Sequence, residues 1–316
     1  MTPVVLGIDT SCYTTSCALA DMQGHVLQSR RLLTVEQGER GLQQSAGLFQ
    51  HVNRLPEILR GVLEQMPDYE IRAVCVSERP RPQQDSYMPV FLAGSCVAQS
   101  IAMALRVPLY HTSHQQGHVR AALIDTGLRA ERFVALHLSG GTTESLLVDH
   151  GALSLIGGSN DLHAGQFVDR AGVALGLPFP AGPHLEKLAS GGKAVPRIKL
   201  AHRDGYVSFS GAESQVQRMV AEGSVAPADI AMEVYHYIAR AVAQIIIYAH
   251  EQTHASDVLL AGGVASSALL RDLLNQRLHR KKLKVRLHWA KPEYAGDNAC
   301  GVALIGLEQY AKQCKE

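Results

Sequence analysis

The sequence has almost no net charge, no Cys-x-x-Cys pair and no sustained apolar leader. With 30 lysines and arginines against 29 acidic residues, the formal charge is +1, so the chain as a whole lacks the electrostatic footprint of a nucleic-acid binder, although a local basic patch stays open. Its six cysteines lie mostly in apolar stretches, which favours reduced thiols. No segment is expected to reach the length of a membrane span. We therefore expect a cytoplasmic protein with no membrane contact.

A strand pattern occurs twice in the 316 residues. In the first copy an apolar run ends in Asp9-Thr10-Ser11, and two further runs complete a predicted three-strand meander. In the second copy Phe133 to Leu138 ends in Ser139-Gly140-Gly141-Thr142-Thr143, and again two runs follow. Two copies predict a duplicated α/β protein with a central cleft between its halves. We place the lobes at 1–110 and 111–316, the second lobe carrying most of the nucleotide and metal site.

Helical periodicity fills the intervals between these strands. The longest such segment runs from Pro227 to His254, and the last helix is expected to begin at Asp297. The other helices are predicted at 42–66, 90–105, 169–175, 184–189 and 267–280.

Two histidines, His114 and His118, stand four residues apart. On a helix they lie on one face, one turn apart, so both imidazoles can reach a single ion. Ser113 is a good N-cap for a helix beginning at His114, which would leave His111 off that helix. The alternative is a pair of histidines that face solvent or hydrogen-bond to neighbours.

Asp297 is either a helix cap or a third metal ligand. As a hard oxygen donor it would complete a His, His, Asp set that leaves open positions for a substrate. A zinc protease is excluded because the general-base glutamate after the first histidine is here Gln115, which cannot take a proton.

Three small-residue tips each follow an apolar strand: Asp9-Thr10-Ser11, Ser139 to Thr143, and Ala261-Gly262-Gly263-Val264. Glycine exposes backbone amides that suit a phosphate, and helix N-termini add to the attraction. The three tips together favour a nucleotide in the cleft. The alternative is three tight turns.

Basic residues concentrate between Arg277 and Arg286. A helix C-terminus favours cations, so a solvated helix end explains the run. A docking surface for RNA phosphates is the alternative.

Motifs along nearly the whole chain resemble the TsaD family, also called Gcp or YgjD. They are Gly7 to Cys12, His114 to His118, Ser139-Gly140-Gly141, Ala164-Gly165 with Asp169, Leu175 to Pro178 through Gly182-Pro183, Ser208 to Gly211, Ala261 to Val264, and Pro292-Glu293 through Asp297-Asn298. The resemblance implies the actin-like, Hsp70-like ATPase fold (ASKHA). It also implies transfer of a threonylcarbamoyl group from threonylcarbamoyl-AMP to the N6 amine of adenosine in tRNA.

The same resemblance assigns a site. It implies one divalent metal ion (iron or zinc, with magnesium as an alternative) on His114, His118 and Asp297, with no catalytic residue beyond the metal centre. The predicted ligands of ATP, ADP or threonylcarbamoyl-AMP are Asp9, Ser11, Ser139, Gly140, Gly141, Thr142, Thr143, Asp169, Gly182, Gly262, Gly263 and Ser267. TsaB-like and TsaE-like proteins are the implied partners, and tRNA is the implied acceptor.

Five departures from the family pattern lie near the inferred cleft. Tyr13-Thr14 replaces an acidic pair, Gln116 a glutamate, Thr142 a histidine and Ser267 an asparagine, and residues 78–89 lack a glycine-rich loop. They suggest a divergent paralogue that acts on another carbamoyl acceptor or serves as a non-catalytic scaffold or regulator. A sugar or acid kinase of the same fold is a weaker alternative, because it leaves the histidine pair unexplained.

Overall fold

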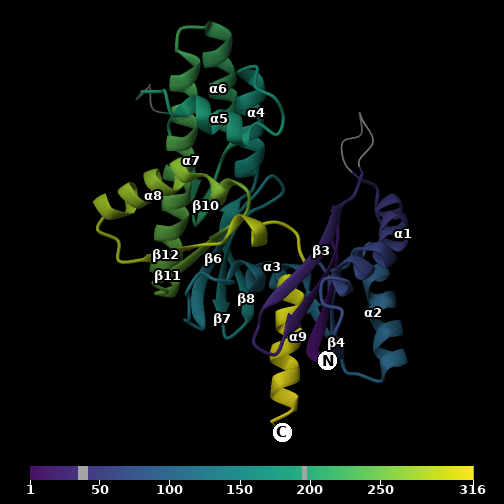
Figure 1. The fold of residues 1–316 in the computed structure, drawn as a ribbon. Coiled ribbons are helices and arrows are strands. Elements are labelled where there is room, and N and C mark those ends of the chain that lie inside the picture. Colours follow the sequence, from purple (N-terminus) through teal and green to yellow (C-terminus); the bar gives the residue numbers. More distant parts are fainter. Residues whose placement is uncertain (35–41, 194–197, 316) are drawn as a thin grey trace. The chain divides into compact units, whose positions relative to one another are not determined.

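Two separate sheets organise the chain in the computed structural model, which describes residues 1–34, 42–193 and 198–315 (Figure 1). By their contacts the residues divide into two compact units. Unit 1 comprises Met1–Ile124 and Glu293–Glu316, and unit 2 comprises Asp125–Pro292. This division differs from the predicted lobes 1–110 and 111–316.

Unit 1 is built on a five-stranded sheet of order β3-β2-β1-β4-β5. Strands β1, β2 and β3 pair antiparallel in succession, which confirms the first predicted meander. Strand β4 pairs parallel with both β1 and β5. The elements are β1 (Thr2–Thr10), β2 (Thr14–Asp21), β3 (Val26–Leu32), α1 (Gln44–Leu63), β4 (Tyr69–Arg79), α2 (Phe91–Leu105), β5 (Leu109–Ser113), α3 (His114–Ala122) and α9 (Cys300–Gln313).

The first strand is buried along almost its whole length because helices cover both faces of the sheet. Leu6 and Ile8 pack in a core with Leu55 of α1 and Ala98 of α2. A second cluster joins Ala18 and Ala20 of β2 to Ala121 of α3 and to Ala303 and Leu304 of α9. A strand buried on both faces reads as a continuous apolar run, which is why the residues from Val4 onward show no alternation.

Helices α3 and α9 pack so closely that glycine is required between them. A Cβ atom on Gly301 would lie 1.9 Å from the backbone oxygen of Gly117. Because α3 and α9 bury their apolar side chains against strands of unit 1, residues 111–124 and 293–316 belong to that unit. The sequence division at residue 110 missed this return of the chain.

Unit 2 is built on a seven-stranded sheet of order β12-β11-β6-β7-β8-β10-β9. Strands β6, β7 and β8 form the second predicted antiparallel meander, and β11 runs parallel to both β6 and β12. The elements are β6 (Arg132–Leu138), β7 (Thr143–Asp149), β8 (Ala152–Ser159), α4 (Ala164–Ala174), α5 (Gly182–Ala189), β9 (His202–Arg203), β10 (Tyr206–Val207), α6 (Ser210–Glu222), α7 (Pro227–Thr253), β11 (Asp257–Ala261), α8 (Ala268–Arg280) and β12 (Arg286–Trp289).

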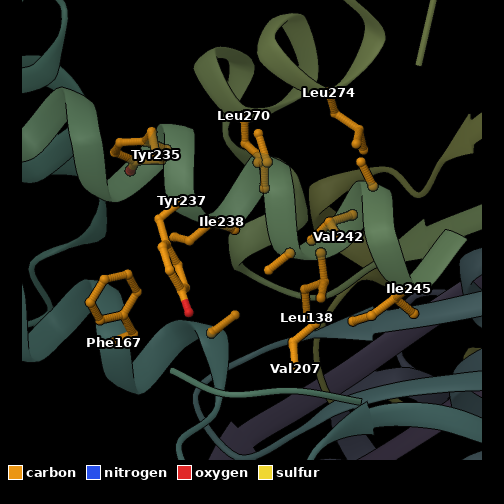
Figure 2. Packing of buried hydrophobic residues seen from close by; sticks show 14 of the residues in the cluster. Leu138, Phe167, Val207, Tyr235, Tyr237, Ile238, Val242, Ile245, Leu270 and Leu274 are labelled. Carbon is orange, nitrogen blue, oxygen red and sulfur yellow. The ribbon is translucent and has the colours of Figure 1, made fainter. Parts of the chain in front are cut away.

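Helix α7 is the centre of the core of unit 2. Figure 2 shows Tyr237, Val242 and Ile245 of this helix among residues of the sheet and of neighbouring helices, including Leu138 and Leu270. The helix has 27 residues and a mean hydropathy of 1.3, enough to cross a membrane by length and composition, and 78% of that window is buried inside the protein. The expectation that no segment reaches the length of a membrane span is therefore wrong. The burial accounts for the apolar composition, as in a core helix.

Candidate functional site

Three parallel strands of unit 1 bring their carboxyl ends to one edge of the sheet. Strands β1, β4 and β5 are neighbours in the order β1-β4-β5, and each runs in the same direction. Asp9 lies at the end of β1, Ser77 near the end of β4, and His114 directly after β5. Ligands of open α/β sheets bind at this edge. The topology therefore collects three polar side chains from distant parts of the sequence.

Helix α3 begins at His114 as the sequence predicted. The Ser113 hydroxyl accepts a hydrogen bond from the backbone N–H of Gln116, and the Gln116 side chain accepts one from the backbone N–H of Ser113. This capping box fixes the first turn of the helix. His111 lies on β5 with its Nδ1 2.9 Å from Glu78, which confirms that it is off the helix.

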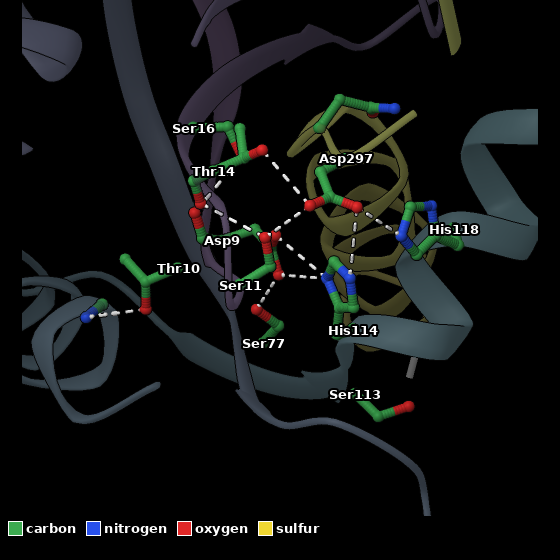
Figure 3. Close-up of polar contacts among 12 residues, drawn as sticks. Asp9, Thr10, Ser11, Thr14, Ser16, Ser77, Ser113, His114, His118 and Asp297 are labelled. Atoms are coloured by element: carbon green, nitrogen blue, oxygen red, sulfur yellow. Dashed lines mark hydrogen bonds and ion pairs between the residues drawn. The ribbon is translucent and has the colours of Figure 1, made fainter. Parts of the chain in front are cut away.

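The imidazole of His114 is oriented by Asp9. Nδ1 of His114 lies 3.0 Å from each carboxylate oxygen of Asp9, a fully buried residue that also accepts a hydrogen bond from the Ser77 hydroxyl (Figure 3). An ionised carboxylate accepts only, so Nδ1 carries the hydrogen and Nε2 is left as the donor atom toward a ligand. Carboxylate, histidine and ligand atom in this order are the usual support of a metal-binding imidazole.

Asp297 is held from the opposite side by two hydroxyl groups. Its Oδ2 accepts hydrogen bonds from Ser11 Oγ at 2.8 Å and from Thr14 Oγ1 at 3.2 Å. Its Oδ1 lies 3.0 Å from Nε2 of His118 and 3.6 Å from Nε2 of His114 (Figure 3). One carboxylate oxygen is thus used by the protein, and the other faces both imidazoles.

The donor set fits a divalent metal ion. One ligand atom from each of His114, His118 and Asp297 lies within 4.8 Å of the others. Bonds of about 2.0–2.2 Å to nitrogen and oxygen place neighbouring donors about 3–3.5 Å apart, close to the 3.0 and 3.6 Å that separate Asp297 Oδ1 from the two imidazole nitrogens. The three side chains are 19, 13 and 28% exposed, so the group is open on one side to solvent or substrate.

The charges of the group are strongly coupled. Burial alone would lower the pKa of His114, but the charge of Asp9 and the hydrogen bonds with Asp297 and Asp9 raise it well above 6.5. Burial alone would raise the pKa of Asp297, but its hydrogen bonds with His114 and His118 and their charges lower it well below 3.8. The carboxylate is therefore ionised and ready to bind a cation, which would replace the proton on His114.

One local prediction at this site is wrong. Asp297 does not begin the last helix, because α9 starts at Cys300. The N-cap position is Ala299, and Asn298 just before it supports the first turn: its Oδ1 accepts a hydrogen bond from the backbone N–H of Cys300, and its amide donates to the oxygens of Tyr294 and Gly296. Asp297 is thereby free of capping and points at the histidines.

Two departures from the family pattern are used inside the fold. Gln116 completes the capping box of α3, a task that glutamate also performs. Thr14 donates to Asp297. The two residues that stand in place of acidic ones therefore make hydrogen bonds that hold the start of α3 and the carboxylate of Asp297.

In unit 2 the predicted nucleotide residues lie mostly at strand and helix ends. Gly140 and Gly141 form the exposed turn between β6 and β7, closed by a hydrogen bond from the N–H of Ser139 to the oxygen of Thr142 at 2.8 Å. Thr143 is buried, and its hydroxyl accepts from the first N–H of α4, at Ala164. The turn thus offers open backbone, while Thr143 anchors a helix.

Asp169 and Gly182 meet at the start of α5. Asp169 accepts a hydrogen bond at 2.8 Å from the N–H of Ala181, and the Tyr235 hydroxyl donates to the oxygen of Gly182 at 3.2 Å. The N-terminus of this helix is thereby fixed from two directions.

The third tip follows β11, the parallel neighbour of β6. Gly262 has φ +98°, and a Cβ there would lie 2.3 Å from the oxygen of Leu138, so this turn requires glycine. Gly263 is exposed, and Ser267 caps α8 by accepting from the N–H of Leu270 at 3.1 Å. The open backbone lies at Gly140, Gly141 and Gly263, whereas Thr143 and Ser267 serve as caps. Their binding roles stay predictions.

The sequence analysis missed Ser77, and it named Thr14 only as a departure from the family pattern. Both carry only hydroxyls in apolar strands, and no local pattern distinguishes them as supports of this group. Asp9 and Ser11, which were predicted to bind nucleotide, lie beside His114 and Asp297. Their binding of nucleotide stays a prediction. A correct strand order would have indicated that these residues lie together, because residues at the ends of adjacent parallel strands meet.

Solved structures of similar fold span the whole chain. HypF from T. kodakarensis has a TM-score of 0.65 at 14% identity, over 98% of this chain and 48% of that one. Component A of the (R)-2-hydroxyglutaryl-CoA dehydratase from Acidaminococcus fermentans has a TM-score of 0.56 at 18% identity, over 98% of this chain and 100% of that one. These similarities confirm the predicted duplicated actin-like, Hsp70-like fold class.

Sequence relatives identify the family. The family model described as "TsaD: tRNA N6-adenosine threonylcarbamoyltransferase" matches residues 48–304. Proteins named tRNA N6-adenosine threonylcarbamoyltransferase from Methylobacillus flagellatus and Aromatoleum aromaticum are both 30% identical to the chain, covering 98 and 96% of it and 94 and 90% of their own lengths. The chain therefore belongs to the TsaD family of tRNA N6-adenosine threonylcarbamoyltransferases.

Proposed function

We propose that the chain transfers a threonylcarbamoyl group from threonylcarbamoyl-AMP to the N6 amine of adenosine in tRNA. Family membership supports the reaction class. The observation that carries the proposal for this particular chain is the group formed by His114, His118 and Asp297, because Asp9 orients His114, two hydroxyls orient Asp297, and the donor atoms of all three lie within 4.8 Å of one another. A scaffold would gain little from such an arrangement.

The reaction needs placement more than covalent catalysis. A bond forms between N6 of adenosine and the carbamoyl carbon, the bond from that carbon to the phosphate oxygen of AMP breaks, and the amine loses a proton. The mixed anhydride is already activated, so holding the amine against the carbonyl removes much of the barrier. When bound, a divalent ion would supply Lewis-acid polarisation and charge for the phosphate.

The residues of the chain have separate tasks in this proposal. Asp9 keeps Nδ1 of His114 protonated and Nε2 available, and Ser11 and Thr14 keep Oδ1 of Asp297 turned toward the imidazoles. The open turns at Gly140 and Gly263 offer backbone amides to the phosphate of the adenylate or of ATP or ADP. Two imidazoles and one carboxylate suit iron or zinc better than magnesium, which prefers oxygen donors.

Reconstitution tests the proposal. Purified chain is combined with the adenylate-forming enzyme, ATP, threonine, bicarbonate and unmodified tRNA, with and without TsaB-like and TsaE-like proteins, and nucleosides are analysed by mass spectrometry. We expect threonylcarbamoyladenosine from the wild type and none from His114→Ala. No product from the wild type, beside an active enzyme of the family as control, would reject the proposal in favour of another acceptor or a scaffold role.

A further inference from the structure

Positive side chains from three segments of unit 2 surround one cavity. It measures about 450 Å³ and lies where α7, α8 and residues 199–202 meet. No lining residue that the structure describes carries a carboxylate. The polar lining consists of Lys199, His202, Arg240, Gln244, Arg277 and Lys281.

Helical spacing explains how these residues converge. Arg240 and Gln244 are four apart on α7, and Arg277 and Lys281 are four apart at the end of α8, so each pair lies on one helix face. In the described parts of the chain, Lys199 and Lys281 are exposed and form no ion pair. Arg277 and Lys281, which belong to the basic run, are thus joined at the cavity by Lys199 and Arg240.

Arg240 is the exceptional residue, because it is a cation only 5% exposed on the most buried helix. One of its terminal nitrogens donates to Glu233 Oε1 at 2.6 Å and to the oxygen of Ile198 at 2.9 Å. Its Nε has no acceptor among the described residues. Arg240 is therefore a fixed cation in the wall of the cavity, held in place by Glu233 and the oxygen of Ile198.

A second cavity of about 270 Å³ adjoins the first. The two share His202 and Gln244 in their linings, and the second is also lined by Tyr206 of β10 and Tyr248 of α7. Its one carboxylate among the described lining residues, Asp204, is paired with Arg203 at 3.1 Å. Cations beside aromatic rings suit a nucleotide unit, whose phosphate pairs with the cations and whose base stacks on an aromatic face.

We propose that these two cavities are a docking site for one strand of the tRNA substrate, with a phosphate in the cationic cavity and the attached base against the tyrosines. The site rests on the proposed function for the identity of the RNA. A strand fits better than a free nucleotide because the positive charge continues past the cavity to Arg280, Lys282 and Lys284, all exposed. An extended row of cations matches a phosphodiester backbone.

The test compares two double variants of equal charge. Lys199→Ala with Lys281→Ala removes two cations of the cavity, and Lys312→Ala with Lys315→Ala removes two exposed cations of unit 1. Binding of labelled tRNA to each full chain is followed by fluorescence anisotropy between low and high salt. We expect the first pair to weaken binding roughly tenfold and to lower the slope of log affinity against log salt by about 2. The second pair should change neither.

Further arms separate the outcomes. Equal tRNA binding by both double variants would overturn the proposal. Tyr206→Ala should weaken binding without changing the salt slope, and Tyr206→Phe should restore it.

One variant keeps this inference apart from the proposed function. Asp297→Asn should lose transfer and keep tRNA binding. If the wild type makes no product while the cavity variants still weaken tRNA binding, the transfer fails and the docking site stands. If the wild type makes product and the cavity variants bind tRNA like the wild type, the transfer stands and the docking site fails.

Discussion

The two units present their strand ends in opposite ways. In unit 1 the side chains at the sheet edge are locked, since Asp9, Ser11, Thr14 and Ser77 all hydrogen-bond to the metal-binding group or to each other. In unit 2 the turns at Gly140 and Gly263 expose backbone and no side chain. A fixed set of side-chain donors suits one small ion. Open backbone suits a larger anion whose identity changes between substrate and product.

The largest effect should follow the loss of a first ligand. Asp297→Asn removes the negative donor, so we expect stoichiometric metal binding to disappear and transfer to fall roughly 10³-fold, as loss of several kcal/mol of stabilisation implies. Elemental analysis and nucleoside mass spectrometry measure the two effects.

The matched control for that variant is Asp257→Asn. Asp257 is held by Nε2 of His288 at 2.7 Å and by Arg286 at 2.5 Å. It lies at the start of β11, whereas the open turn at Gly263 follows the end of that strand. The Asp257→Asn protein should therefore bind metal with the stoichiometry of the wild type. Retention of metal by Asp297→Asn would show that the side chains of unit 1 are a hydrogen-bond network only.

A smaller effect should follow loss of the supporting carboxylate. Asp9→Asn leaves all three ligands but no longer fixes the hydrogen on Nδ1 of His114, so metal affinity should fall about 10- to 100-fold with unchanged stoichiometry. Competition with a chelator measures it. An Asp9→Asn protein with wild-type affinity would mean that the orientation of His114 is set elsewhere.

Metal affinity should rise with pH. The pKa of His114 is raised well above 6.5 in the ion-free protein, so at neutral pH the imidazole carries a proton that a metal must displace. Affinity should therefore weaken steadily as pH falls through that raised pKa. Titration calorimetry in buffers of different ionisation enthalpy should detect a released proton, and a pH-independent affinity would contradict the assignment.

The glycines of unit 2 should separate fold from binding. Gly262→Ala forces a Cβ against the oxygen of Leu138 at φ +98° and should destabilise the protein by about 1–3 kcal/mol in urea unfolding. A Cβ on Gly140 meets nothing within 4 Å, so Gly140→Ala should unfold like the wild type. A loss of nucleotide affinity in Gly140→Ala alone would place the ligand at this turn, and unchanged affinity would move it away.

The smallest effect concerns the capping box. Gln116→Ala should cost about 0.5–1 kcal/mol of stability, whereas Gln116→Glu, the residue usual in the family, should be neutral because both side chains accept from the N–H of Ser113. Equal destabilisation by both variants would assign Gln116 a role other than capping.

Much of the fold was predictable because it follows local patterns. Apolar runs located the strands of both meanders, and Ser113 located the start of α3. The hydroxyls that support Asp9 and Asp297 were not predictable from spacing, because Ser77 and Thr14 reach the site only through the strand order. The hydrogen bond from Asn298 to the first turn of α9 was also missed, because Asp297, one residue earlier, is an equally good capping residue by type. The return of α9 to unit 1 depends on packing between α3 and α9, which no local pattern records.

Because unit 2 is inserted between the two parts of unit 1, synthesis on the ribosome sets an order of assembly. Strand β1 with Asp9 and helix α3 with His114 emerge early, but Asp297 and the helix that packs against Gly117 emerge last. Until then Ala18, Ala20 and Ala121 lack the cover that α9 provides. At about 5–20 residues per second, unit 1 waits roughly ten seconds or more for the intervening segment, so metal can be loaded only into a finished chain.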